Sequence, residues 1–427
     1  MRSLLLLALV ACADRPTTDA GTSDDVTNGK PFKCAVAEDD SKFVPDPRIL
    51  RWPYVTNVTT STATVQWGLA AGTTGTIEWG EDDGFGQEAE VETAPIDFIT
   101  NPIALQTAVL SGLKPGRGYC YRLTLDGKDM TGPMALHTAP VNDTDEKVRF
   151  MAMGDYGGGT LSMAGPVLTE ILKHEDEFDF WVTTGDNVYD SGTWQEWEDN
   201  QFTFYRQLLR RGISYWPVPG NHDYGSVFSL APMMANLDLP RNALREEDLE
   251  RYYSFDWGPV HFTMADSQLA VKQVDLIDGV DDMAVWMKED LDRNQDRPWR
   301  IAVWHHPMYM TTPERSVEPP VALVLSPIVE AAEVPLVLTG HNHCYERFSN
   351  MKDGAKLPEG GTTYIITGGG GKSLYDVDPT APNAHLTEAS VSTYHFMLFE
   401  ADRCTLTGRA IDLNGTELDR FELNRCN

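Results

Sequence analysis

Long apolar runs, basic residues and cysteine are all scarce in this chain of 427 residues. The longest apolar run, residues 4–11, is far shorter than the roughly 20 residues of a membrane-spanning helix, so no segment is expected to cross a bilayer. Lys and Arg number 34 against 64 Asp and Glu, and the formal net charge is -30. Such an acidic surface repels nucleic acid and anionic lipid, which argues against either as a partner.

The first residues are typical of an export signal. Arg2 precedes the apolar run, and Cys12 follows the small residue Ala11. Residues 1–12 resemble a bacterial lipoprotein signal, in which Cys12 would carry the lipid and provide the membrane attachment. Because the apolar run is short, the alternatives are an ordinary export signal with a secreted product, or a start assigned too early. We expect an exported protein, either anchored at the cell envelope or secreted.

Apart from the cysteine in the signal, five of the six cysteines remain, an odd number for an oxidising compartment. One thiol should therefore be free. Cys344 lies inside a histidine motif where a disulfide would constrain the site, so we expect it to be a buried thiol. The expected disulfides join Cys404 to Cys426, which bracket a C-terminal strand pair, and, on weaker grounds, Cys34 to Cys120. Sequence alone does not determine this connectivity.

Composition divides the rest of the chain into a tether and two domains. Residues 13–42 are rich in Thr, Asp, Gly and Ser, which predicts a disordered acidic linker. Short alternating strands fill residues 43–141, and about seven such strands are typical of a small antiparallel β-sandwich. The turn at residues 113–116, before Tyr119, resembles fibronectin type III domains. Over residues 146–427 apolar strands alternate with helical segments, which predicts a layered α/β domain, a β-sandwich flanked by helices.

Five short motifs in the second domain place oxygen or imidazole groups directly after a predicted buried strand. The candidate ligands in them are Asp155, Asp186, Tyr189, Asn221, His305, His341 and His343. Strands of an α/β sheet open into loops at their carboxyl ends, so these side chains are expected to meet there. This ligand set indicates two metal ions, which suit phosphoester hydrolysis and would attract an anionic substrate to an acidic protein.

The motifs read GDYG, GDNVY, GNHD, HHP and GHNHCYER. They resemble the calcineurin-like metallophosphoesterases and, within them, the purple acid phosphatases, in which a tyrosine phenolate binds ferric iron. A sandwich domain precedes the motifs, as in plant-type and many bacterial members. The resemblance implies that the ferric ion is held by Asp155, Asp186, Tyr189 and His343. It implies that a divalent iron, zinc or manganese is held by Asp186, Asn221, His305 and His341.

The resemblance also bears on residues that would act on the substrate. The family pattern of His, any residue, Pro selects His305 as the ligand and leaves His306 beside it, although adjacent strand residues face opposite ways and the reverse choice stays open. His222 matches the phosphate-contacting histidine and is expected to hydrogen-bond the transition state or to protonate the leaving oxygen, with Asp223 orienting it. Where the family has a second histidine this chain has Glu314, so the proton donor is His222 or Glu314.

The resemblance therefore implies an acid phosphatase that hydrolyses small phosphate monoesters by attack of a metal-bound hydroxide. One alternative is a phosphodiesterase or nucleotide hydrolase of the same superfamily, and another is a non-catalytic surface binding protein. The glycine run 368–371 lacks the Gly-Lys-Ser/Thr signature of a phosphate loop, so we expect a close backbone approach beneath the site. Structural roles are expected for four histidines outside the motifs: His174, His261, His385 and His395.

Overall fold

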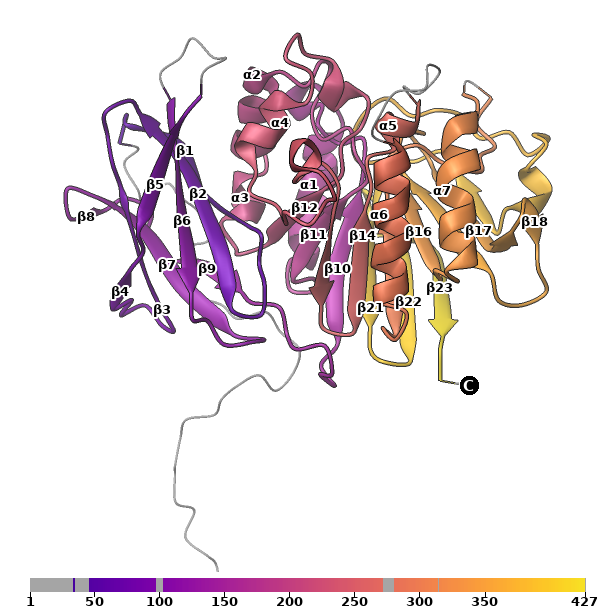
Figure 1. Cartoon of the computed structure of the whole chain (residues 1–427). Helices are drawn as coiled ribbons and strands as arrows, with labels where there is room; N and C mark the ends of the chain where they lie inside the picture. The colour runs from indigo at the N-terminus through magenta and orange to yellow at the C-terminus, as the bar shows by residue number, and fades with distance from the viewer. Residues whose placement is uncertain (1–33, 35–45, 97–102, 272–279, 314, 427) are drawn as a thin grey trace, which may run out of the picture.

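The computed structural model describes Cys34 and residues 46–96, 103–271, 280–313 and 315–426 (Figure 1). The predicted signal, nearly all of the predicted linker, and Glu314 lie outside the described residues. Among the helices that are described, none combines the length and the apolar character needed to cross a bilayer.

The N-terminal part of the chain is a β-sandwich of two antiparallel sheets (Figure 1). The strand order is β1-β2-β6-β5 in one sheet and β4-β3-β7-β8 in the other, where β9 also pairs with β7. The strands are β1 (Ile49–Thr56), β2 (Thr62–Ala70), β3 (Thr76–Gly80), β4 (Gln87–Glu88), β5 (Val91–Pro95), β6 (Ile103–Ser111), β7 (Gly118–Leu125), β8 (Lys128–Asp129) and β9 (Met134–His137). The Tyr119 hydroxyl accepts a hydrogen bond from the Lys114 N–H at 2.7 Å, a corner typical of immunoglobulin-like sandwiches. The predicted fibronectin III-like character agrees with this sandwich.

Two further sheets pack face to face in the second part of the chain, in the orders β12-β11-β10-β21-β22-β23 and β13-β14-β15-β16-β19-β17-β18, with β20 beside β17. Their strands are β10 (Val148–Met153), β11 (Phe180–Thr183), β12 (Ser214–Pro217), β13 (Tyr253–Trp257), β14 (Val260–Met264), β15 (Trp299–Val303), β16 (Leu336–Thr339), β17 (Tyr345–Lys352), β18 (Ala355–Lys356), β19 (Thr362–Thr367), β20 (Ala389–Val391), β21 (His395–Ala401), β22 (Thr405–Asp412) and β23 (Glu417–Asn424). Aromatic rings fill the space between the sheets, and Phe150 on β10 meets Phe262 on β14 edge-on at 5.1 Å between ring centroids. The predicted layered fold is confirmed.

Helices flank both sheets. The longer ones are α1 (Ala164–Ile171), α6 (Val280–Arg293) and α7 (Pro319–Ala331); the shorter ones are α2 (Trp194–Glu196), α3 (Arg206–Leu209), α4 (Ala231–Asn236) and α5 (Ser267–Val271). Single turns are η1 (Gly159–Leu161), η2 (Leu172–His174), η4 (His222–Tyr224), η5 (Glu246–Asp248) and η6 (Ala384–Leu386). Figure 1 shows α6 and α7 over the outer face of the eight-stranded sheet, and Trp286, Leu325 and Val337 belong to one buried hydrophobic cluster. The helix predicted near residues 194–210 is broken by a π-helical segment, η3 (Trp197–Thr203).

A buried arginine joins the N-terminal sandwich to the second domain. The Arg51 side chain on β1 is 1% exposed and forms an ion pair with Glu198 in the π-helical segment. Its Cζ lies 3.9 Å from the centroid of the Phe202 ring, and the neighbouring Tyr54 hydroxyl donates a hydrogen bond to the Asn236 carbonyl. A buried charge that loses its partner destabilises a protein strongly. Separating the two domains would leave Arg51 and Glu198 unpaired, so this ion pair holds the domains together.

The disulfides agree with the pairing expected from the sequence. Cys34 is joined to Cys120 on β7, and Cys404 is joined to Cys426 across the ends of β22 and β23. Cys344 is free and buried, so that prediction is also confirmed.

His261 on β14 is a structural histidine. It is buried, and its two ring nitrogens lie 2.7 Å from Asp256 Oδ1 and 2.8 Å from Asp290 Oδ2. Arg297 pairs with the second oxygen of Asp256 at 2.6 Å. Burial alone would lower the pKa of His261, but hydrogen bonds and charge from the two carboxylates raise it overall.

Replacing His261 by Gln (His261→Gln) is expected to destabilise the protein more in acid than in alkali. A folded-state pKa above the unfolded value of about 6.5 gives stability that is complete below that pH and lost as the pH rises through the folded pKa. Urea unfolding at about pH 5.5 should show that the variant has lost about 3 kcal/mol of its free energy of unfolding. This loss should become smaller towards about pH 9. An equal loss at both pH values would mean that folding does not raise the pKa of His261.

Candidate metal centre

The candidate ligands lie where strands of both large sheets end at one edge. Asp155 and Asp186 follow the parallel strands β10 and β11, and Asn221 follows β12. His305 and His341 follow the parallel strands β15 and β16 of the other sheet. Asp155, Asp186 and His341 have φ angles of 56°, 51° and 68°, in the left-handed region that side-chain-bearing residues seldom adopt. Such strained backbone is concentrated at functional sites.

Glycine allows the loops to approach one another closely. A Cβ atom on Gly220 would lie 2.1 Å from the Asp186 backbone nitrogen, and one on Gly340 would lie 2.6 Å from Asp155 Oδ2. The expected close approach of the glycine run 368–371 is confirmed, since a Cβ on Gly368 would lie 2.2 Å from the carbonyl oxygen of a neighbouring loop. Any larger residue at these positions would push the ligand loops apart.

Tyr189 lies at the centre of one group of donor atoms. Its hydroxyl oxygen is 3.0 Å from Asp155 Oδ1, 2.8 Å from Asp186 Oδ2 and 3.4 Å from His343 Nε2. His343 Nδ1 lies 2.6 Å from the Ser373 carbonyl oxygen, which can only accept, so Nδ1 carries the hydrogen. The lone pair of His343 Nε2 is therefore directed at the group, as in a metal-bound imidazole.

Asn221 lies at the centre of a second group. Its Oδ1 atom is 3.1 Å from His305 Nε2 and 2.9 Å from His341 Nδ1, and His305 Nε2 is 3.4 Å from Asp186 Oδ1. His305 Nδ1 donates to the Thr184 carbonyl at 2.8 Å, which again leaves the other ring nitrogen for a ligand. The structure thus brings all seven predicted ligands together, four in each group with Asp186 shared.

The donor atoms fit two metal ions. Ligands about 2.0–2.2 Å from one ion lie roughly 3 Å from one another, which is the spacing of both groups. Asp186 offers Oδ2 to the first group and Oδ1 to the second, as a bridging carboxylate does. Burial and the charges of Asp155 and Asp186 raise the pKa of Tyr189 far above its usual range. A bound cation reverses this field and favours the phenolate.

His222 lies at the open side of the Tyr189 group. The two ring centroids are 4.4 Å apart, and the His222 backbone N–H donates to Asp186 Oδ1 at 2.9 Å. His222 Nδ1 lies 2.6 Å from the Asp190 carbonyl oxygen, so Nδ1 carries a hydrogen and Nε2 is left to meet a substrate oxygen.

The expectation that Asp223 orients His222 is wrong. Asp223 is fully buried, and its carboxylate accepts hydrogen bonds from the Asn187 side chain and the Gly220 N–H, both at 2.8 Å. Successive residues of a 3-10 turn point about 120° apart, so Asp223 turns inward while His222 faces the open side. Burial and the charge of Asp186 raise the pKa of Asp223 to about 7. Asp223 ties two ligand loops together.

His306 lies behind the second group. Its Nδ1 atom is 2.8 Å from Ser267 Oγ, and its ring centroid is 4.6 Å from that of His341. His305, rather than His306, approaches Asp186 and Asn221, although one nitrogen of each of the three rings lies within 4.8 Å of the others. Glu314, the other expected proton donor, lies outside the described residues.

Sequence reasoning missed three residues at the rim of this centre. Lys372 Nζ lies 4.3 Å from the centroid of the Tyr189 ring. Tyr375 stacks on His343 with 4.3 Å between ring centroids, and Arg315 donates a hydrogen bond to the Tyr375 hydroxyl. The available signal was local: Lys372 directly follows the glycine run that approaches the site.

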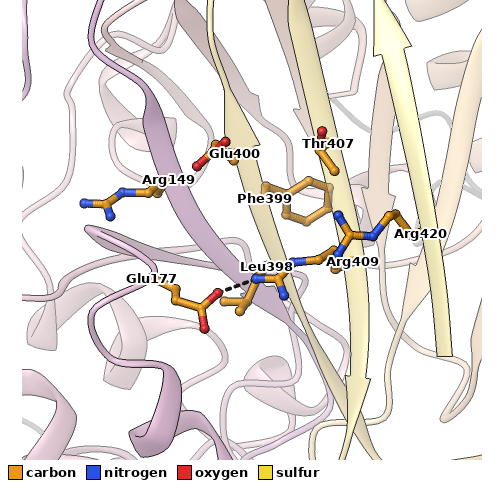
Figure 2. Close-up of a pocket in the computed structure, with 8 residues that line it drawn as sticks. All are labelled: Arg149, Glu177, Leu398, Phe399, Glu400, Thr407, Arg409 and Arg420. Atoms are coloured by element: carbon orange, nitrogen blue, oxygen red, sulfur yellow. Dashed lines mark hydrogen bonds and ion pairs between the residues drawn. The ribbon is translucent and has the colours of Figure 1, made fainter. Parts of the chain in front are cut away.

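A hollow on the outer face of the six-stranded sheet lies away from the candidate metal centre (Figure 2). It includes Arg149 near the start of β10, whereas the candidate ligands follow the strand ends. Its arginines are already paired, for example Arg409 with Glu177. The described residues that line this hollow do not form a second cluster of metal ligands.

The comparisons with known proteins agree with this geometry. Residues 148–345 match the calcineurin-like phosphoesterase family. This chain contains a calcineurin-like phosphoesterase domain. Purple acid phosphatase 4 of Arabidopsis thaliana is 26% identical over 54% of this chain and 70% of its own length. Purple acid phosphatase 21 of the same plant is 27% identical over 69% of this chain and 65% of its own length.

Solved structures show the same fold as the phosphoesterase domain and its sandwich. The purple acid phosphatase PPD1 from yellow lupin seeds has a TM-score of 0.75 at 20% identity, covering 87% of this chain and 74% of that chain. A structure of PhoD has a TM-score of 0.64 at 13% identity, covering 90% of both chains. The expected resemblance to the purple acid phosphatases is confirmed, and these matches support a metal-dependent phosphoesterase.

Proposed function

We propose that this protein is an acid phosphatase that hydrolyses small phosphate monoesters with a ferric ion and a divalent iron, zinc or manganese ion. The observation that carries the proposal is the position of Tyr189, whose hydroxyl lies within 3.0 Å of both Asp155 and Asp186. The resemblance to the purple acid phosphatases implies a ferric ion at such a tyrosine. The second group, built from neutral imidazole and amide donors with one carboxylate oxygen, suits a divalent ion.

The ions, when bound, supply Lewis acidity that attracts phosphate and lowers the pKa of water. The residues of the chain determine where this chemistry takes place. Asp186 offers one oxygen to each group and so would hold both ions. The Asp190 carbonyl fixes the His222 tautomer, so that Nε2, once protonated, donates to a phosphate or leaving-group oxygen.

Two disulfides support the proposal that the phosphoesterase is exported. Cys34–Cys120 and Cys404–Cys426 are the kind of bond that persists in oxidising compartments. We propose attachment to a bacterial cell envelope through lipid on Cys12, or secretion, with no nucleic-acid partner.

One experiment tests both the substrate and the iron. Protein loaded with iron and zinc is assayed on para-nitrophenyl phosphate and on bis(para-nitrophenyl) phosphate, and its visible spectrum is recorded. We expect kcat/KM at least about tenfold higher for the monoester, because both ions neutralise a dianion better than a monoanion. We also expect a visible band that disappears in Tyr189→Phe.

Tyr121→Phe is the matched control, because the buried Tyr121 hydroxyl in the sandwich has no hydrogen-bond partner among the described residues. It should leave rate and colour unchanged. A diester rate above the monoester rate would favour a phosphodiesterase instead. Absence of any turnover would favour a binding protein, and colourless protein with a full complement of iron would refute the ferric phenolate.

A further inference from the structure

Arg315 places a guanidinium group at the rim of the metal centre. Its Cζ lies 4.9 Å from the centroid of the Tyr375 ring, and a terminal nitrogen donates to the Tyr375 hydroxyl. Tyr375 in turn stacks on His343, with 4.3 Å between centroids and 9° between ring planes. The arginine is therefore held one aromatic ring away from a candidate metal ligand.

Most of the Arg315 guanidinium is uncommitted. In the described part of the chain, its only side-chain hydrogen bond is the one to Tyr375, and no carboxylate lies within ion-pair distance. Arg251, Arg297 and Arg347 by contrast each pair with an aspartate at 2.8, 2.6 and 2.6 Å. In a chain of net charge -30, an unpaired cation beside a phosphoesterase centre is available for an anion.

We propose that Arg315 binds the non-bridging oxygens of the substrate phosphate and adds to the preference of the two ions for dianionic monoesters over monoanionic diesters. This inference rests on the proposed phosphatase function. The planar guanidinium presents paired N–H groups that match two phosphate oxygens, which an ammonium cannot do. Tyr375 is a positioning residue, because it holds one side of the fork and leaves the other side open.

The contact between Arg315 and the non-bridging phosphate oxygens forms equally in the ground state and the transition state. Its loss therefore raises KM and leaves kcat almost unchanged. In the metal-loaded full chain, Arg315→Met should raise the Kd of inorganic phosphate, measured by calorimetry, about 10- to 100-fold. KM for a monoester should rise by a similar factor, with kcat within about threefold.

Two milder variants keep the test informative if Arg315→Met folds poorly. Arg315→Lys retains the charge without the fork and should give a smaller rise in phosphate Kd. Tyr375→Phe keeps the ring on His343 but removes the hydroxyl that holds Arg315, and should raise Kd about 2- to 5-fold. Arg420→Met is the charge-matched control, because the half-exposed Arg420 pairs with Glu417 on β23.

The outcomes separate this inference from the proposed function. An unchanged phosphate Kd in folded Arg315→Met, or a loss confined to kcat, would overturn the role of Arg315 while the phosphatase activity stands. An effect as large in Arg420→Met would also overturn it. Wild-type protein that neither binds phosphate nor cleaves esters would overturn both.

Discussion

Replacing Asp186 by Asn is expected to lower kcat/KM for a phosphate monoester by at least about 10³-fold. Asp186 offers Oδ2 to the Tyr189 group and Oδ1 to the Asn221 group, so one substitution weakens both. The amide has nearly the shape of the carboxylate, and the loop should therefore stay in place. Steady-state kinetics and metal analysis of the purified variant measure the effect, and bound metal should fall together with the rate.

Asp292→Asn on α6 is a matched control, because this aspartate is 59% exposed and pairs with Lys288. Its rate and metal content should equal those of the wild type. An Asp186→Asn variant that retains two ions and full activity would show that the bridging oxygen comes from another residue.

Replacing Arg51 by Ala is expected to lower the free energy of unfolding by about 3–5 kcal/mol. Glu198 is 15% exposed and would be left without its partner in a site that water barely reaches. The contact of the guanidinium with the Phe202 ring at 3.9 Å would be lost as well. Urea unfolding followed by tryptophan fluorescence measures the change, and Trp194 beside Arg51 reports on the junction.

Arg122→Ala provides the comparison within the sandwich. Arg122 and Glu78 form an ion pair whose side chains are 30% and 24% exposed, so its loss should cost at most about 1 kcal/mol. A double variant, Arg51→Ala with Glu198→Ala, should recover part of the lost stability because no buried charge is left unpaired. A loss below about 1 kcal/mol in Arg51→Ala would mean that apolar packing alone joins the domains.

Local patterns were enough to predict the ligands. Asp186 and Tyr189 stand three residues apart after one buried strand, so a short loop keeps them together in any α/β fold. His341 and His343 follow β16 in the same way. Each signal depends on a strand of apolar residues that ends beside a polar motif, and both halves of that signal are readable in a few consecutive residues.

Residues beyond the motifs could not be predicted in this way. Their adjacency in sequence predicts that Asp223 orients His222, yet the 3-10 turn points the two side chains apart. Arg315 and Tyr375 are 60 residues apart, and only the folded chain brings them together. Neither carries a motif, so the spacing of ligands could not reveal them.

The sequence by itself determined the fold class and the ligand types, because each depends on short-range periodicity or on the chemistry of single side chains. Only the tertiary structure decided that Asp223 ties loops together, that Arg51 joins the two domains, and that Arg315 has no carboxylate partner at the rim among the described residues. These roles depend on distances between segments far apart in the chain. Such distances are determined by how the sheets pack, which no short window of sequence contains.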